Sequence, residues 1–302
     1  MRLVFAGTPT VALPSLDALV ASEHEVVAVV TRPDAPVGRG RKLTPSPVAM
    51  RAEELGIEVL KPEHPRDPDF QERLRELAPA ACPVVAYGAL LPQSALDIPT
   101  HGWVNLHFSL LPRWRGAAPV QRAIMAGDDV TGTTCFRIVR ELDAGPVYDI
   151  EEVPMPDETA GELLGRLAIS GAAQLVGVMD AVAAGTLPVE QGEEGVTVAA
   201  KLTTEDARVD FDRPAGEVRN HIMGCSPDPG AWCEVDGQRL KLYRARVADD
   251  RGLAPGALEA TKREVFVGAG SGTIELLEVQ APGKRRMAAI DWARGGVAGV
   301  LR

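Results

Sequence analysis

Two short apolar runs with a helical stretch between them constrain the fold of this chain more than any other feature. Residues 2–6 and 25–31 are predicted to be buried β-strands, because nearly all their side chains are apolar. Residues 12–21 between them have the spacing of an amphipathic helix. This order indicates a right-handed strand–helix–strand unit in a parallel sheet. The turn after the first strand lacks the three-glycine fingerprint, so we do not expect a nicotinamide cofactor.

The same alternation continues through the first two thirds of the chain. Further strands are predicted at residues 57–60, 83–87, 103–109, 133–139 and 147–153, and further helices at 48–55, 67–77 and 159–184. We expect an α/β fold, with a Rossmann-like, mostly parallel sheet and helices on both faces. After about residue 206 the pattern changes to short strands separated by Gly-containing turns, which favours a small OB-like β-barrel domain.

A polar connector separates these two patterns. We therefore predict a first domain at residues 1–189, a linker at 190–205 and a second domain at 206–302. The second domain carries 15 Lys and Arg against 14 Asp and Glu, although the whole chain has a net charge of −10. This asymmetry permits an anionic partner on the second domain.

Composition and cysteine usage indicate a cytoplasmic protein. The chain has 302 residues, 45% of them hydrophobic and 25% charged, as expected for a globular protein with a full core. No uninterrupted apolar run approaches the roughly 20 residues of a membrane helix. A strand that starts at Arg2 leaves no room for a signal or transit peptide. The four cysteines show no C-x-x-C spacing, so we expect neither disulfides nor a metal site.

The strand at residues 103–109 lacks the continuous apolar pattern of a strand that is buried on both faces. Asn105, His107 and Ser109 occupy alternate positions and so share one face. Burying an unpaired polar group costs about 2–7 kcal/mol, so these side chains are either paired internally or line a cleft. A loop and the start of a helix follow at residues 110–121. Open α/β sheets bind their ligands at such strand ends.

A basic segment interrupts the sheet pattern at residues 32–47. It holds six Pro or Gly residues, and its charged residues are Arg32, Arg39, Arg41 and Lys42 against Asp34 alone. A structureless loop of this length is uncommon in a compact domain and tends to be functional or disordered. The segment is either a solvated surface loop or an arm that reaches a phosphate backbone.

One motif resembles a known family. Asn105-x-His107-x-Ser109-Leu110-Leu111-Pro112, followed by Arg115-Gly116-x-x-Pro119, is similar to the signature of the folate-dependent formyltransferases. The resemblance covers nearly the whole chain. The signature alone is shared by members that act on glycinamide ribonucleotide or on sugar nucleotides. The basic segment and the second domain resemble features of the members that formylate methionyl-tRNA.

The resemblance implies roles for specific residues. The catalytic trio is expected to be Asn105, His107 and Asp143. Folate contacts are expected from two loops, formed by Ser109, Leu110, Leu111 and Pro112 and by Val85, Ala86, Tyr87, Gly88 and Leu90. Contacts with tRNA are expected from Arg39, Arg41 and Lys42, and from Lys284, Arg285 and Arg286. Two departures from the family pattern are Thr10-Val11, where an acid and an aromatic residue are usual, and Pro146 after the Asp143 turn.

The expected function is transfer of a formyl group from 10-formyltetrahydrofolate to the α-amino group of methionyl initiator tRNA. Hydrogen-bond donors on Asn105 and His107 would stabilise the charge that develops on the formyl oxygen, and the Asp143 carboxylate would favour the imidazolium. No metal is expected from this residue set. We expect a monomer without membrane contact. A sugar-nucleotide N-formyltransferase and a non-catalytic tRNA-binding protein stay open as alternatives.

Overall fold

The chain folds into two compact units, each assembled from segments that are not consecutive in sequence. The computed structural model describes residues 1–37, 40, 42–295 and 299–302. The first unit consists of Met1–Gly116, Gly132–Val153 and Leu164–Val198. The second consists of Ala117–Thr131, Pro154–Leu163 and Ala199–Arg302. The consecutive boundaries at residues 189 and 206 stay a prediction.

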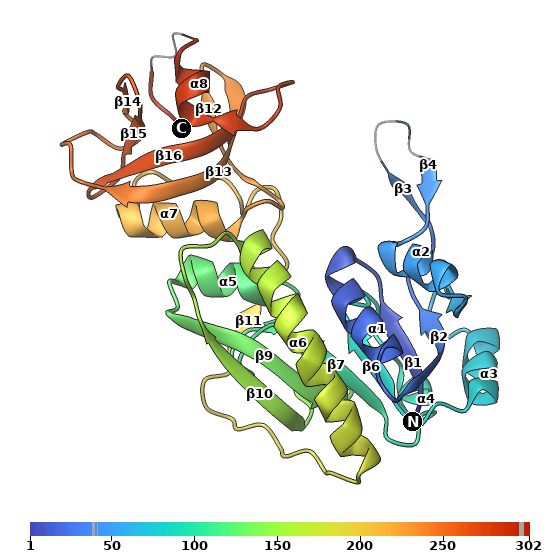
Figure 1. Ribbon diagram of the computed structural model, residues 1–302. Helices are drawn as coiled ribbons and strands as arrows, with labels where there is room; N and C mark the ends of the chain where they lie inside the picture. The colour runs from blue at the N-terminus through green and yellow to red at the C-terminus, as the bar shows by residue number, and fades with distance from the viewer. Residues whose placement is uncertain (38–39, 41, 296–298) are drawn as a thin grey trace. The chain divides into compact units, whose positions relative to one another are not determined.

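A seven-stranded sheet forms the centre of the first unit (Figure 1). Its strands lie in the order β10 (Val147–Pro154), β9 (Val130–Arg137), β7 (Trp103–His107), β6 (Cys82–Val85), β1 (Arg2–Gly7), β2 (Glu25–Val30) and β5 (Glu58–Leu60). The five strands from β7 to β5 pair in parallel, whereas β9 pairs antiparallel with β7. The predicted α/β fold with a mostly parallel sheet is therefore confirmed.

The helices of this unit begin where the sequence provides a start signal. Ser46 is the N-cap of α2 (Pro47–Glu54), and its Oγ accepts a 3.0 Å hydrogen bond from the Ala49 backbone N–H. Proline also stands in the first turn of other helices of this unit. Further helical elements of this unit are η1 (Thr10–Ala12), α1 (Leu13–Val20), α3 (Pro68–Leu77) and α4 (Gln93–Leu96).

The long helix α6 (Ala160–Ala183) is a core helix although it is unusually apolar. By length and composition it would suffice to cross a membrane, with a mean hydropathy of 1.2 over its best window. Leu167, Leu175 and Met179 are fully buried in the fold. A Cβ atom added at Gly171 would lie 2.9 Å from the side chain of Leu106 on β7, so this helix packs directly on the sheet.

The basic segment is a β-hairpin at its base, which corrects the expectation of a structureless loop. Strands β3 (Ala35–Val37) and β4 (Lys42–Thr44) pair antiparallel, with Ala35 opposite Thr44. Pro36 is tolerated because a two-stranded ribbon leaves one edge of each strand unpaired. The single acid of the segment, Asp34, pairs with Lys61 at 2.8 Å. Arg39 and Arg41 lie outside the described residues.

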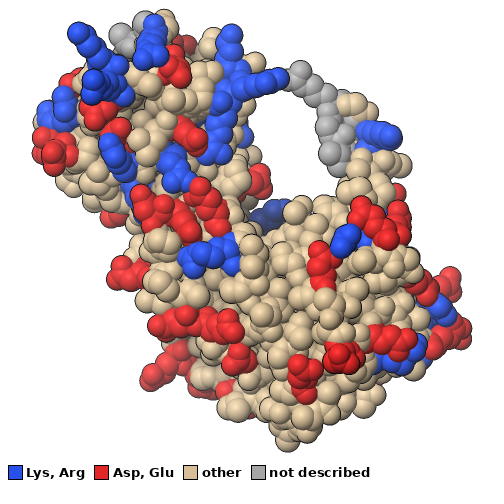
Figure 2. All heavy atoms as spheres, in the orientation of Figure 1, with Lys and Arg blue, Asp and Glu red and all other residues tan. Residues whose placement is uncertain are grey.

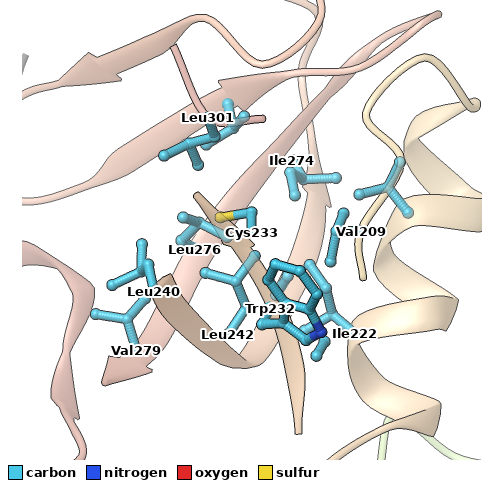
Figure 3. Close-up of a cluster of buried hydrophobic side chains, with 14 of the residues drawn as sticks. Val209, Ile222, Trp232, Cys233, Leu240, Leu242, Ile274, Leu276, Val279 and Leu301 are labelled. Carbon is cyan, nitrogen blue, oxygen red and sulfur yellow. The ribbon is translucent and has the colours of Figure 1, made fainter. Parts of the chain in front are cut away.

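A curled antiparallel sheet forms the second unit, as the predicted barrel-like domain requires. Its strands are β12 (Ala231–Val235), β13 (Gln238–Ala248), β16 (Thr273–Gln280), β15 (Val265–Gly268), β14 (Leu258–Ala260) and β17 (Met287–Ala288), the last paired with β16. The helices are α5 (Pro119–Ala126), α7 (Ala215–Gly224) and α8 (Ala289–Ala293). Figure 3 shows the core, where Ile222 of α7 points toward Trp232 and Leu242 of the sheet.

Candidate active site

The polar face of β7 places two of the candidate catalytic side chains. Asn105 and His107 are two residues apart on the strand and therefore point to the same face. Leu106 points to the opposite face, where it contacts α6 at Gly171. On the face with Asn105 and His107, the imidazole meets Trp114 of the loop after β7 and Asp143 of the loop after β9. Those loops supply the rest of the site.

Hydrogen bonding determines which nitrogen of His107 remains for chemistry. The imidazole is buried, and its Nε2 lies 2.9 Å from the backbone carbonyl of Trp114. A carbonyl oxygen only accepts hydrogen bonds, so Nε2 carries a proton and donates it. The ring also meets Phe136 edge-on, with centroids 6.3 Å apart. The nitrogen left for a substrate is therefore Nδ1.

Asp143 faces this remaining nitrogen. Its Oδ2 lies 3.9 Å from Nδ1 of His107 and accepts a 2.7 Å hydrogen bond from the backbone N–H of Gly116. The residue has a left-handed backbone with φ of 47°, a conformation that Asp adopts more readily than most residues. The structure thus brings together the two residues that the motif placed 36 positions apart in sequence.

Asn105 lies next to this pair. It is half-buried on β7 between Val84 of β6 and Phe136 of β9. Among the residues that the structure describes, its side-chain amide has no hydrogen-bond partner. The amide is therefore available to a bound substrate.

The loop Ser109–Pro112 is tied to β9 rather than open. Thr134 Oγ1 donates to the Ser109 carbonyl at 2.7 Å and accepts from the Leu111 N–H at 3.1 Å. The Ser109 hydroxyl is fully buried and donates to the Arg113 carbonyl at 2.7 Å. Leu111 is also buried, whereas Leu110 and Pro112 are half-buried. Ser109 therefore shapes this loop, and a contact with folate is more accessible to Leu110 and Pro112.

The loop after β6 presents its residues alternately. Val85 and Tyr87 are buried, whereas Ala86, Gly88 and Leu90 are exposed. Ala86 and Gly88 have φ of 48° and 83°, so the chain turns sharply here. The Thr8 hydroxyl holds the turn by donating to the Tyr87 carbonyl at 2.7 Å.

The residues expected to bind tRNA lie on both units. Lys42 is exposed at the start of β4. Lys284 and Arg285 are exposed on the second unit and form no ion pair within the described residues, whereas Arg286 pairs with Glu278 and stacks over Tyr243. Figure 2 shows Lys and Arg side chains gathered over the second unit.

Sequence reasoning missed three polar residues whose side chains hydrogen-bond to the backbone of the loops around the site. Besides Thr8, these are Gln191 and Thr197, which hydrogen-bond to the loops around His107. Both lie in the segment expected to be a linker, whose polar composition carried no sign of this role. No signal in one sequence would have found them.

The four cysteines are not placed as reactive thiols. The four cysteines are free and buried, and burial raises the pKa of each thiol, to about 12 for Cys225 and Cys233. They therefore stay protonated and behave as small core residues. Within residues 1–37, 40, 42–295 and 299–302, no group of three or more His, Cys, Asp or Glu is placed to hold a metal ion.

Comparison with known families agrees with this geometry. Residues 1–179 match the family model for formyl transferase, and residues 201–296 match the formyl transferase C-terminal domain. The chain belongs to the formyl transferase family. It is similar to methionyl-tRNA formyltransferase from Streptomyces coelicolor, with 62% identity over 299 residues that cover 98% of this chain and 96% of that protein.

Solved structures with the same fold are more distant in sequence. HypX from Aquifex aeolicus has a TM-score of 0.70 and 19% identity; the match covers 99% of this chain but only 48% of HypX. An N-formyltransferase from Helicobacter canadensis, solved with folinic acid and dTDP-3-aminofucose, has a TM-score of 0.71 and 16% identity, with 93% of this chain and 99% of that chain covered. At these identities the likeness shows the fold alone.

Proposed function

We propose that this chain transfers the formyl group of 10-formyltetrahydrofolate to the α-amino group of methionyl initiator tRNA, which prepares that tRNA for translation initiation. The observation that carries the proposal is 62% identity, over nearly the whole chain, to a protein named methionyl-tRNA formyltransferase. The His107–Asp143 pair beside the free amide of Asn105 supports an acyl transfer as the reaction. We also propose that the protein acts as a cytoplasmic monomer without membrane contact.

The two donors act on the charge that develops during the transfer. The amine attacks the formyl carbon, the bond from that carbon to the folate nitrogen breaks, and the formyl oxygen is negatively charged in between. The Asn105 amide donates to this oxygen, and His107 donates from Nδ1 because its Nε2 is held by Trp114. In other enzymes a donor of this kind contributes about 2.7–4 kcal/mol.

Asp143 transfers the proton that the attacking amine loses. The attacking amine loses one proton and the leaving folate nitrogen gains one, so the reaction needs a group that passes a proton but keeps none. The Asp143 carboxylate, which lies 3.9 Å from Nδ1 of His107, accepts it from the amine, directly or through water. Neither residue forms a covalent bond to substrate.

Two neighbouring strand ends supply the proposed folate site. β6 and β7 pair in parallel, so the loops that follow them lie side by side. The exposed Ala86 and Gly88 of one loop and the half-buried Leu110 and Pro112 of the other are the residues that a flat ring can reach. The left-handed turn at Ala86 and Gly88 lets the backbone approach a ligand closely.

Within the part of the chain that the structure describes, the proposed tRNA contacts are Lys42, Lys284 and Arg285, and none of the three forms an ion pair there. Lys42 begins β4, the second strand of the hairpin, and the single acid of this segment, Asp34, is neutralised by Lys61. Lys284 and Arg285 are the corresponding exposed cations on the second unit, and we assign them contacts with the tRNA as well. Arg39 and Arg41, outside the described residues, complete the proposed set on sequence grounds alone.

A competition assay tests the acceptor. We expect formyl transfer from 10-formyltetrahydrofolate to charged initiator tRNA when glycinamide ribonucleotide and a UDP-amino sugar compete for the same donor. Transfer to a small acceptor would keep the folate chemistry and contradict the tRNA assignment. Tight tRNA binding without any transfer would favour the non-catalytic alternative.

A further inference from the structure

Two residues on either side of His107 have a strained backbone. Trp114, whose carbonyl accepts the Nε2 proton of His107, has φ of 63°. Asp143, whose carboxylate faces Nδ1, has φ of 47°. A left-handed backbone is unfavourable for a non-glycine residue and persists only where the surroundings hold it. The orientation of His107 therefore depends on what holds these two residues.

The segment between α6 and β11 (Val198–Ala199) holds both. Gln191 Nε2 donates to the Asp143 carbonyl at 2.9 Å and to the Gly145 carbonyl at 2.7 Å. Its Oε1 accepts from Arg115 Nη2 at 2.7 Å. Because carbonyl oxygens only accept and a guanidinium only donates, all three partners agree on one orientation of the Gln191 amide.

Thr197 acts on the other side of the imidazole. Its Oγ1 accepts a 2.8 Å hydrogen bond from the Trp114 N–H, and its carbonyl accepts a 2.9 Å hydrogen bond from the Arg115 N–H. The backbone of Trp114 is thus held on both sides of its Cα atom, since its N–H donates to Thr197 and its carbonyl accepts from His107.

We infer that Gln191 and Thr197 are positioning residues for His107, acting through the Asp143 turn and through Trp114. Neither side chain contacts the imidazole. Each holds one left-handed residue in the conformation that presents a partner to one ring nitrogen. The inference rests on the proposed catalytic role of His107 only for its effect on rate. The orientation of the ring is a separate property of the folded chain.

The experiment compares near-isosteric variants with matched controls. Gln191→Glu keeps an acceptor for Arg115 but turns the donor opposite two carbonyls into an acceptor. Thr197→Val removes the acceptor for Trp114, and Thr197→Ser restores it. Glu190→Gln and Thr186→Val serve as controls, because both residues are exposed and neither side chain contacts the site.

We expect Gln191→Glu and Thr197→Val each to lower kcat about 10-fold to 100-fold, with a much smaller change in KM for folate, and Thr197→Ser to recover most of the loss. The imidazole ¹⁵N chemical shifts of His107 should change in the two damaging variants and in neither control. Circular dichroism spectra should stay the same.

The outcomes separate this inference from the proposed function. Wild-type kcat and unchanged His107 shifts in Gln191→Glu and Thr197→Val would overturn the inference, whatever the acceptor proves to be. If His107 shifts move while kcat stays constant, the positioning is confirmed and the catalytic role of His107 is contradicted. A kcat loss that Thr197→Ser does not recover would overturn the role of the Thr197 hydroxyl.

Discussion

At the scale of residues, the site depends on the different hydrogen-bonding partners of the two ring nitrogens of His107. Nε2 of His107 is committed to a backbone carbonyl, so only Nδ1 is left to face a substrate and Asp143. A side chain fixed in this way loses little rotational freedom when the substrate binds. The same chain offers His101, an exposed histidine, for comparison.

Replacement of His107 by alanine removes the Nδ1 donor but leaves both proposed folate loops intact. We expect His107→Ala to lower kcat about 10²-fold to 10³-fold, the range for a donor to a developing oxyanion, while the Kd for folate changes little. Single-turnover kinetics and a folate titration measure the two quantities. His101→Ala is the control and should match wild type. Near-normal turnover of His107→Ala would remove His107 from the mechanism.

At the scale of elements, α6 begins with a reciprocal cap. The Thr159 N–H and hydroxyl both donate to Glu162 Oε2, at 2.8 and 2.9 Å, and the Glu162 N–H donates back to Thr159 Oγ1 at 3.4 Å. Glu162 also pairs with Arg244 of β13. The hydrogen bond from the Thr159 backbone is the main cause of the lowered pKa of Glu162, with Arg244 adding to it.

This cap should make stability depend on pH. A carboxyl whose pKa is lowered by folding stabilises the native state above its ordinary pKa of 4.5, and the contribution disappears as pH falls through the lowered value. We expect Glu162→Ala to lower the free energy of unfolding by about 0.5–2 kcal/mol at pH 7. Urea denaturation at pH 7 and near pH 3 measures the difference, which should shrink at the lower pH. Glu152→Ala, on the exposed side of β10, is the control; an equal loss at both pH values would contradict the argument.

At the scale of the whole molecule, the distribution of charge limits where a polyanion can bind, and the path of the chain limits where the protein can be truncated. The excess of acid lies on residues 1–205, so attraction of a polyanion falls to particular exposed cations rather than to net charge. The path of the chain also limits dissection. Gly224 of α7 lies so close to α5 that an added Cβ would be 2.6 Å from Met125 Cγ. A cut near residue 206 would therefore strip α5 of its packing partner, and point variants are the better test.

The exposed pair Lys284 and Arg285 should contribute to tRNA affinity mainly through phosphate contacts. We expect the double variant Lys284→Ala/Arg285→Ala to weaken binding and to reduce the slope of log K against log salt by about 2, one for each phosphate contact. Arg286→Ala should change the slope less, because Glu278 already neutralises that guanidinium. Binding measured across a salt series gives the slopes.

The control for the Lys284/Arg285 variant is a second double variant that removes the same two positive charges elsewhere on the second unit. Lys262 and Arg263 are exposed in the turn between β14 and β15, and their double alanine variant should leave the salt slope close to that of wild type. Equal effects of the two double variants would show that net charge matters and that residues 284–285 form no particular surface.

Local sequence pattern by itself determined much of this protein. Strand and helix periods, which depend on residues two to four positions apart, were enough for the parallel sheet and for placing Asn105 and His107 on one face. The family motif then indicated Asp143 and the folate loops. The apolar composition of α6 and the Pro-rich hairpin were harder to interpret, because burial and strand pairing depend on segments distant in sequence.

Only the tertiary structure decided how the site is held. Which nitrogen of His107 is free follows from a carbonyl on a later loop, and the left-handed backbones of Trp114 and Asp143 follow from side chains about 50 to 80 residues further along the chain. A hydrogen bond between segments so far apart leaves no periodic trace in either of them. Gln191 and Thr197 therefore read as part of a polar linker until the fold brings them against the active-site loops.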